Sequence, residues 1–324
     1  MQGPPVDKRL RLIFAGLALV LMIATAIWML QGLPEGRARS FVLGLRAERL
    51  AGLLLVGVTT GIATIIFQTL AGNRVLTPQI MGFDSLYILL QTVLIASIGI
   101  SGFAGIPIWS KFLLDTTVLI GLGCILFGNL LGRGGRDIAR TILTGVILGV
   151  MFRSLSAFIG RVLDPNEYAV VQQSSFASFG HLDAALLPIA AILTITAVGI
   201  ALLMAGQLDV LGLGRDRAVA LGLRYRRVLF VTLGLVAVLV AVPTALIGPV
   251  TFFGLIVAGL THGILRDPRH AALLPAAGMI AAIMLIAGQL VFERLLGQES
   301  FLSVVIEFAG GLFFLYLLLK GRIR

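Results

Sequence analysis

The chain has 324 residues, of which 58% are hydrophobic and only 12% are charged, with a formal net charge of +10. Soluble globular proteins carry about 25% charged residues, so this composition excludes that class and indicates an integral membrane protein. The apolar residues form repeated runs of roughly 18 to 22, long enough for a helix to cross the hydrocarbon, and the alternating pattern of a membrane β-barrel is absent.

Candidate membrane helices follow one another along the whole chain. The spans are Leu12–Leu30, Leu50–Leu70, Tyr87–Ile100, Phe112–Leu131, Ile142–Ile159, Ala185–Ala205, Val228–Ile247, Phe252–Leu265, Ala272–Leu290 and Val304–Leu319. They predict an all-α polytopic protein with about ten transmembrane helices in a single domain, residues 1–324. The first run is too long for the core of a signal peptide, so we interpret it as an uncleaved helix.

The distribution of basic residues predicts the topology. Most Lys and Arg residues fall on one side if the N-terminus is placed inside, which puts both termini in the cytoplasm, together with a polar segment at Leu211–Arg227. Because the positive charge gathers at helix ends and not on one soluble face, nucleic acid is not an expected partner. Arg46, Arg49 and Arg294 fall on the outer side against this rule and need another explanation.

Sequence signatures of enzymatic chemistry are absent. The three lysines, Lys8, Lys111 and Lys320, follow no glycine-rich phosphate-binding loop, so a separate protein would have to hydrolyse ATP. The single cysteine, Cys124, and the dispersed histidines form no catalytic or metal-ligand pattern. We therefore predict no catalytic, cofactor or metal site, and a solvated role for His262 and His270.

Charged residues inside the spans are the remaining functional candidates. They are Glu307, Arg153 and, near the start of the third span, Asp84. Glu307 and Arg153 could form a structural ion pair, face a water-filled path or belong to a proton relay, and the sequence leaves these alternatives open. Glycine pairs such as Gly57 and Gly61 predict close helix packing. Gly145 with Gly149 and Gly259 with Gly263 have the same spacing.

The polar segment contains two Leu-Gly pairs around a short amphipathic stretch. Leu213-Gly214 and Leu221-Gly222 bracket it, with Ala218 between them. Glycine permits tight turns, and Ala218 and Leu221 would offer a small apolar knob for contact with another protein. The composition of the segment thus indicates a partner-facing cytoplasmic loop.

Several stretches, in order and at matching spacings, resemble the permease family of bacterial ABC importers for iron-siderophores, haem and cobalamin. The resemblance runs from about Leu45 to the C-terminus. The matching residues are Arg46 and Arg49; Gln68, Asn73, Pro78 and Gly82; Leu213, Gly214, Ala218, Leu221 and Gly222; Gly248, Phe252, Gly254, Leu255 and Ile256; Asp267, Arg269, Leu273, Leu274 and Pro275; and Glu299. Departures from the family pattern are Arg74, Ala258-Gly259, Gln289 and Gly311.

The resemblance implies the type II ABC importer permease fold and a site for each of two partners. A coupling loop, about residues 208–227, would place two short helices, Val210–Ala220 and one from Gly222 onward, in a cleft of the cytosolic ATPase. An extracytoplasmic substrate-binding protein would present glutamates to Arg46, Arg49 and Arg294, which would explain their place on the outer side. The alternative is that these arginines only reach lipid phosphates.

The translocation path would lie between two permease subunits, identical or homologous, and be lined by the second, fifth and tenth helices. Its candidate residues are Gly149, Arg153, Ser156 and Glu307. The outer stretch from Asp164 to Phe179 resembles the iron-siderophore branch, so the expected substrate is a ferric siderophore carried across the bacterial inner membrane. A proton- or sodium-coupled secondary transporter using Glu307 is the alternative, and a non-transporting scaffold is a third possibility.

Overall fold

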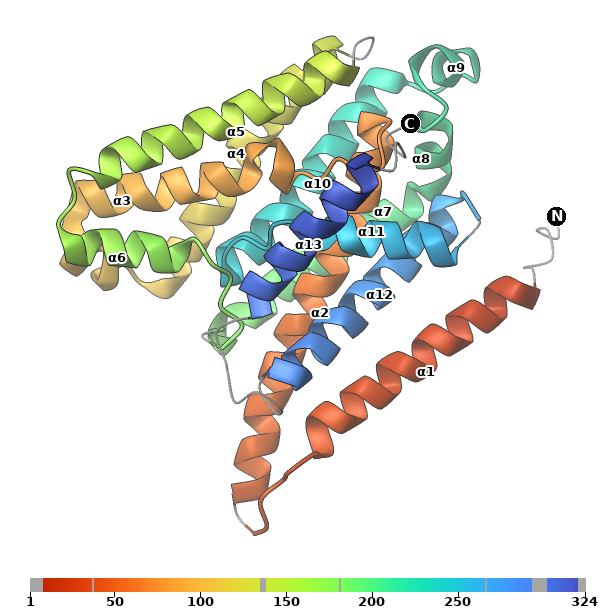
Figure 1. The fold of residues 1–324 in the computed structure, drawn as a ribbon. Coiled ribbons are helices and arrows are strands. Elements are labelled where there is room, and N and C mark those ends of the chain that lie inside the picture. The colour runs from red at the N-terminus through yellow and green to blue at the C-terminus, as the bar shows by residue number, and fades with distance from the viewer. Residues whose placement is uncertain are drawn as a thin grey trace.

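The computed structural model describes residues 8–36, 38–134, 138–180, 182–265, 267–292 and 302–319 (Figure 1). Every regular element in these ranges is helical, in agreement with the predicted fold class. The helices are α1 (Lys8–Leu30), α2 (Ala38–Ala71), the π-helix η1 (Gln79–Phe83), α3 (Asp84–Gly105), α4 (Ile108–Gly134), α5 (Ile138–Gly160), α6 (Pro165–Ser174), the 3₁₀-helix η2 (Ala184–Leu186), α7 (Leu187–Leu203), α8 (Ala205–Leu211), α9 (Arg215–Ala220), α10 (Tyr225–Ile247), α11 (Phe253–Ile264), α12 (His270–Leu290) and α13 (Leu302–Leu319).

Each of the ten spans predicted from the sequence overlaps one long helix of the structure, from α1 to α13. By length and composition, eight helices of the described chain are able to cross a membrane. The apolar stretches of α11 and α13, Phe253–Ile264 and Ser303–Tyr316, are shorter. The multi-pass architecture is therefore confirmed, while the count of ten and the cytoplasmic termini remain predictions.

The second helix is much longer than predicted. It begins at Ala38, twelve residues before the predicted start at Leu50, so Arg46 and Arg49 lie within the helix. The stretch from Ala38 to Arg49 is rich in Ala, Leu, Arg and Glu, which favour helix, and contains no proline to stop it. A helix of 34 residues extends for about 50 Å, well beyond the hydrocarbon thickness.

The centre of the molecule is built around α2, α10 and α12. The most apolar window of α2 is 78% buried, whereas that of α1 is 11% buried, so α1 lies at the periphery. Gly57 and Gly61 let α2 approach α12 closely: a Cβ atom at Gly57 would lie 2.9 Å from the Ala282 nitrogen, and one at Gly61 would lie 2.6 Å from the Ala277 oxygen. The predicted packing role of this glycine pair is thus confirmed.

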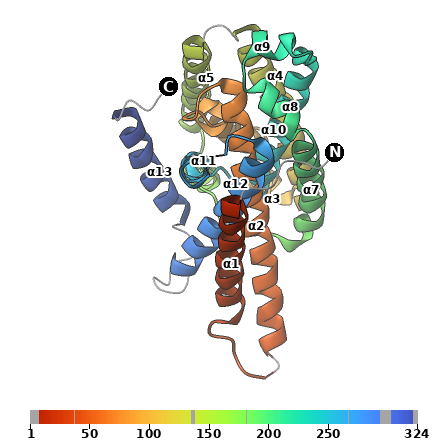
Figure 2. The same ribbon diagram turned by 90° about the vertical axis from the view of Figure 1, so that its right-hand side faces the viewer.

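The short helices α8 and α9 and the α1–α2 connection lie at opposite ends of the molecule. In both views, α8 and α9 lie at one end and the connection between α1 and α2 lies at the opposite end (Figures 1 and 2). The predicted topology assigns the first end to the cytoplasm and the second to the outside. Central helix α2 runs between them.

Candidate coupling site and translocation path

The coupling loop folds into two short helices whose boundaries differ from the prediction. Instead of one helix over Val210–Ala220, the chain ends α8 at Leu211, turns, and begins α9 at Arg215. Gly214 has φ 91°, a conformation that glycine adopts without the strain other residues incur, and this turn breaks the helix. Gly222, with φ 82°, lies in a second turn and does not begin a helix, because α10 starts at Tyr225.

The predicted partner-binding residues of this loop divide into exposed and buried groups. Leu213 is 47% exposed and Leu221 is 64% exposed, and Val219 beside them is 54% exposed. Ala218, in contrast, is fully buried, so the expectation that it offers a surface knob is wrong. Its burial packs α9 onto the rest of the chain, and the exposed apolar surface comes from the leucines and Val219.

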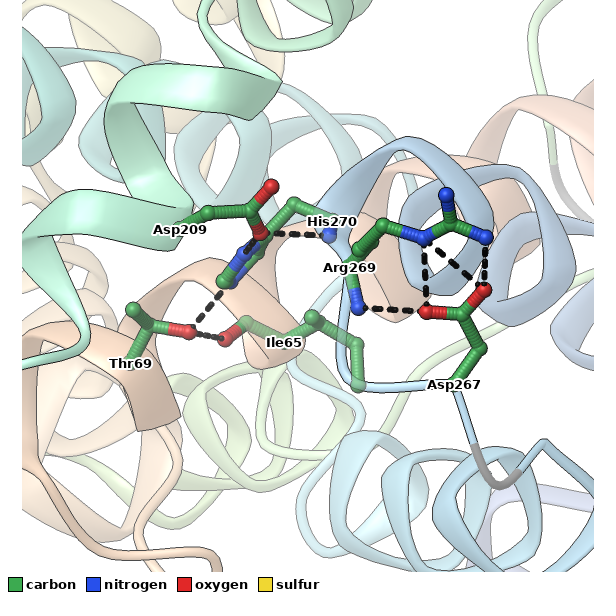
Figure 3. A network of polar contacts seen from close by, with 6 residues as sticks. All are labelled: Ile65, Thr69, Asp209, Asp267, Arg269 and His270. Carbon is green, nitrogen blue, oxygen red and sulfur yellow. Dashed lines mark hydrogen bonds and ion pairs between the residues drawn. The ribbon is translucent and has the colours of Figure 1, made fainter. Parts of the chain in front are cut away.

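A hydrogen-bond network centred on the buried His270 connects α8 to two core helices (Figure 3). Asp209 of α8 accepts from the backbone N–H of His270 at 2.8 Å, and its same oxygen lies 2.6 Å from His270 Nδ1. The other ring nitrogen, Nε2, lies 2.7 Å from the hydroxyl of Thr69 on α2. Thr69 in turn bonds the Ile65 carbonyl at 3.0 Å. We call this the Asp209–His270–Thr69 network.

The chemistry of the network fixes the direction of its main bonds. A carboxylate only accepts, so Asp209 is held by two donors from His270, the backbone N–H and Nδ1–H. His270 is only 5% exposed, so the solvated role expected for it is wrong. Sequence reasoning missed Asp209 and Thr69, because the partners lie 61 and 201 residues from His270 and no spacing rule relates them.

The adjacent loop carries a second ion pair of a different kind. Arg269 donates from its backbone N–H and its Nε to Asp267, at 3.0 Å in each case (Figure 3). These hydrogen bonds from Arg269 lower the pKa of Asp267. The Arg269 side chain is 52% exposed, and the two residues are separated by one proline, so the pair closes the short turn that leads into α12.

A cavity of about 560 Å³ opens beside the Asp209–His270–Thr69 network. Its lining comes from the ends of α2, α8, α11 and α12 and includes Gln68, Arg74, Asp209, His262 and Arg269. Among the described residues, no group of three or more His, Cys, Asp or Glu side chains is arranged to hold a metal ion. The cavity therefore lies at the junction between the coupling loop and the core helices.

The outer arginines occupy different environments. Arg46 is buried and donates from Nη1 to the Met29 carbonyl at 2.9 Å and from Nη2 to the Gly32 carbonyl at 3.3 Å. Its own carbonyl accepts from Nε1 of the buried Trp28 at 3.1 Å. These contacts fasten the α1–α2 hairpin, residues 28–46. Arg49 is half-buried, and Arg294 and Glu299 lie outside the described residues.

The interior charges do not pair as one of the sequence alternatives supposed. In the described chain Arg153 forms no ion pair with Glu307 and instead donates to the Ser85 hydroxyl at 3.4 Å. The Thr251 hydroxyl donates to Asp84 Oδ2 at 2.6 Å, and Arg153 and Glu307 are near enough to act on the Asp84 carboxylate. No sequence pattern indicated that Thr251 belongs to this group.

Two other path candidates lie on α5. A Cβ atom at Gly149 would lie 3.0 Å from the Gly82 Cα, so α5 and η1 meet backbone to backbone. Gly82, with φ 100°, can only be replaced at a conformational cost. Ser156 is 7% exposed, and its hydroxyl has no hydrogen-bond partner in the described structure.

Comparisons with known proteins agree with this architecture. Residues 10–320 match the FecCD transport family. The chain is 39% identical to the petrobactin import system permease YclO of Bacillus subtilis, covering 86% of this chain and 89% of that protein. It is 31% identical to the petrobactin import permease FatC of Bacillus anthracis, covering 86% and 78% respectively.

More distant matches extend the same pattern. The ferric enterobactin permease FepD of Escherichia coli is 28% identical, with 91% of each chain covered. In fold, the structure is similar to a putative metal-chelate type ABC transporter in an inward-facing conformation, with a TM-score of 0.81 at 22% identity, covering 96% of this chain and 99% of that one. The fold is thus that of type II ABC importer permeases.

The match spans nearly the whole chain, and the relatives named are transport permeases and not enzymes. Family membership does not favour the proton- or sodium-coupled alternative. The multiple apolar helices and the family together make this a multi-pass protein of the bacterial inner membrane. The chain belongs to the FecCD transport family and is a permease of the siderophore and metal-chelate class of ABC importers.

Proposed function

We propose that this permease moves a ferric siderophore inward, driven by separate cytosolic ATP-binding subunits and supplied by an extracytoplasmic substrate-binding protein. The observation that carries the proposal is the coupling loop. It presents Val219 on α9 and Leu213 and Leu221 in the turns on either side of α9, at one end of the molecule, each about half exposed or more. Exposed apolar side chains flanked by polar ones favour contact with another protein.

The substrate follows from the relatives. YclO and FatC are both named as petrobactin import permeases, and FepD as a ferric enterobactin permease. A ferric siderophore of the petrobactin kind is therefore the first substrate to test. Direct measurement of bound chelate on the copurified binding protein would identify it.

Arg153 marks the proposed translocation path. It is exposed on α5 among exposed apolar side chains, including Ile147, Val150 and Met151. An arginine on an apolar membrane face requires a water-filled path or a protein partner, which supports a second permease subunit packed against this face. Arg153 would then attract an anionic ferric complex. Intact transport by an Arg153→Ala variant would remove the residue from the path.

We propose that the remaining candidate residues line the same translocation path as Arg153. Glu307 on α13 lies near Asp84 and Thr251, and Gly149 and Ser156 flank Arg153 on α5. On the outer side, Arg49 and Arg294 are proposed to bind carboxylates of the binding protein. Arg46 is proposed to contribute there mainly by holding the hairpin, since its donors already reach backbone carbonyls.

The decisive experiment is uptake into vesicles that contain the permease, its ATPase and the binding protein. We expect ferric petrobactin uptake that requires ATP and survives a proton uncoupler. Uptake abolished by the uncoupler but retained after ATP depletion would instead favour a secondary transporter.

The coupling loop is tested in the same vesicles. A glutamate at the fully buried Ala218 should displace α9, so Ala218→Glu should leave ATP hydrolysis unable to drive uptake. Uptake per ATP equal to that of the unmodified complex would contradict the assignment of Leu213, Gly214, Ala218, Leu221 and Gly222 to ATPase coupling.

A further inference from the structure

One helix reaches both proposed partner surfaces. Arg49 lies in the outer third of α2 and Thr69 lies near its other end, within the same uninterrupted helix. Twenty residues separate them, so at 1.5 Å per residue the distance along the axis is about 30 Å. This is about the thickness of the hydrocarbon core. A displacement at one end of α2 can therefore be transmitted to the other end through one continuous helix.

The second feature is the close fit of α2 against α12. At Gly57 and Gly61 no Cβ atom fits without a shift of the α12 backbone at Ala282 and Ala277. Helices in such contact have little room to slide or rotate independently, because close-packed interiors transmit small displacements. We treat α2 and α12 as one body, the α2–α12 pair.

The third feature is how the coupling loop meets this pair. Helix α9 packs on α8 and α10, and α8 packs on α12 and α2 as well as on α7 and α10. The polar contact between α8 and the pair is the Asp209–His270–Thr69 network, which holds one residue from each of the three helices (Figure 3). The His270 ring at the centre of the network is buried, whereas the Asp209 side chain is 34% exposed, so these bonds are shielded from water on the His270 side.

We propose that the α2–α12 pair is the rigid body that connects the two partner surfaces, and that the Asp209–His270–Thr69 network is the joint that fastens the coupling loop to it. This inference rests on the proposed function, because it requires an ATPase at the coupling loop and a binding protein near Arg49. Coupling between two binding sites is reciprocal, so the ATPase should sense the binding protein through this joint.

The test is the stimulation ratio: ATP hydrolysis by the purified permease–ATPase complex in vesicles with the loaded binding protein, divided by hydrolysis without it. Asp209→Asn removes the charge at constant shape, and His270→Gln removes the ring that reaches both partners. We expect each variant to lower the ratio about fivefold or more, the range of a typical coupling energy. The double variant should be no worse than either single one, because both changes open the same joint.

Asp267→Asn is the matched control. It removes the same charge three residues before His270, but the contact that it weakens is the ion pair with Arg269 and not a bond of the Asp209–His270–Thr69 network. Its stimulation ratio should equal that of the unmodified complex. Thr69→Val tests the branch to α2 alone, since it removes the hydroxyl and keeps the side-chain shape, and it should lower the ratio to an intermediate value.

Misfolding and loss of the joint are separable, because misfolding reduces the amount of permease and copurified ATPase, whereas an open joint changes the ratio per complex. A normal ratio in Asp209→Asn and His270→Gln, or an equal fall in Asp267→Asn, would overturn the inference while leaving the importer intact. An unmodified complex with neither stimulation nor ATP-dependent uptake would overturn the proposed function and the inference together.

Discussion

The two ends of α2 use buried polar side chains in different ways. At the outer end, Arg46 bonds carbonyls 14 and 17 residues away and holds a hairpin between neighbouring helices. At the other end, the His270 network joins residues 61 and 201 apart and holds helices that are distant in sequence. The first arrangement stabilises a local turn, and the second connects a partner-facing loop to the core. Polar side chains thus fasten a local hairpin at one end of α2 and join helices that are distant in sequence at the other.

The largest expected effect comes from separating the α2–α12 pair. A leucine at Gly61 would press into the Ala277 backbone, so Gly61→Leu should lower the free energy of unfolding by about 3 kcal/mol and reduce the membrane level of the protein. Thermal denaturation in detergent measures the first and immunoblotting the second. Gly44→Leu, on the same helix with no atom within 4 Å of an added Cβ, is the control and should behave as the unmodified protein.

Removing the Arg46 contacts that hold the α1–α2 hairpin should lower the free energy of unfolding by a smaller amount. Arg46→Ala removes two charge-assisted hydrogen bonds to carbonyls, so we expect a loss of about 2 kcal/mol in the free energy of unfolding. The exposed Arg39→Ala on the same helix should change stability little. If Arg46→Ala kept full thermal stability but lost binding-protein affinity, a docking role for Arg46 would be restored.

The single hydrogen bond from the Trp28 indole to the Arg46 carbonyl should contribute less to the free energy of unfolding than the two Arg46 bonds do. Trp28→Phe keeps most of the buried aromatic surface and removes the Nε1 donor to the Arg46 carbonyl, at an expected cost of about 1 kcal/mol. Trp109 is 43% exposed, and Trp109→Phe is the matched control. Equal denaturation temperatures for the two variants would show that the bond contributes nothing to the hairpin.

Reversing the charge of Arg49 should have the smallest effect on stability and a clear one on transport. Arg49 is half-buried, so Arg49→Glu should leave the membrane level unchanged while repelling the carboxylates of the binding protein and lowering uptake. Arg39→Glu, the same reversal on a more exposed residue, should lower uptake less. Unmodified uptake in Arg49→Glu would exclude the residue from docking.

Much of the fold was predictable because membrane helices are specified locally. Runs such as Ala272–Leu290 are apolar over a length that only a spanning helix satisfies, and the structure places α12 there. The spacing of Gly57 and Gly61 likewise predicted their close packing. The boundaries failed where local signals were weak, as at Ala38, where helix-favouring residues continue beyond the apolar run.

The sequence by itself determined the membrane class, the order of the helices, the polar loop at Leu211–Arg227 and the resemblance that names the family. Only the tertiary structure decided that Ala218 is buried, that Arg46 bonds its own hairpin, and that Asp209, His270 and Thr69 meet. The physical reason is that apolar length and turn residues act within a few positions of the chain. A hydrogen bond between distant helices depends instead on how the whole bundle packs.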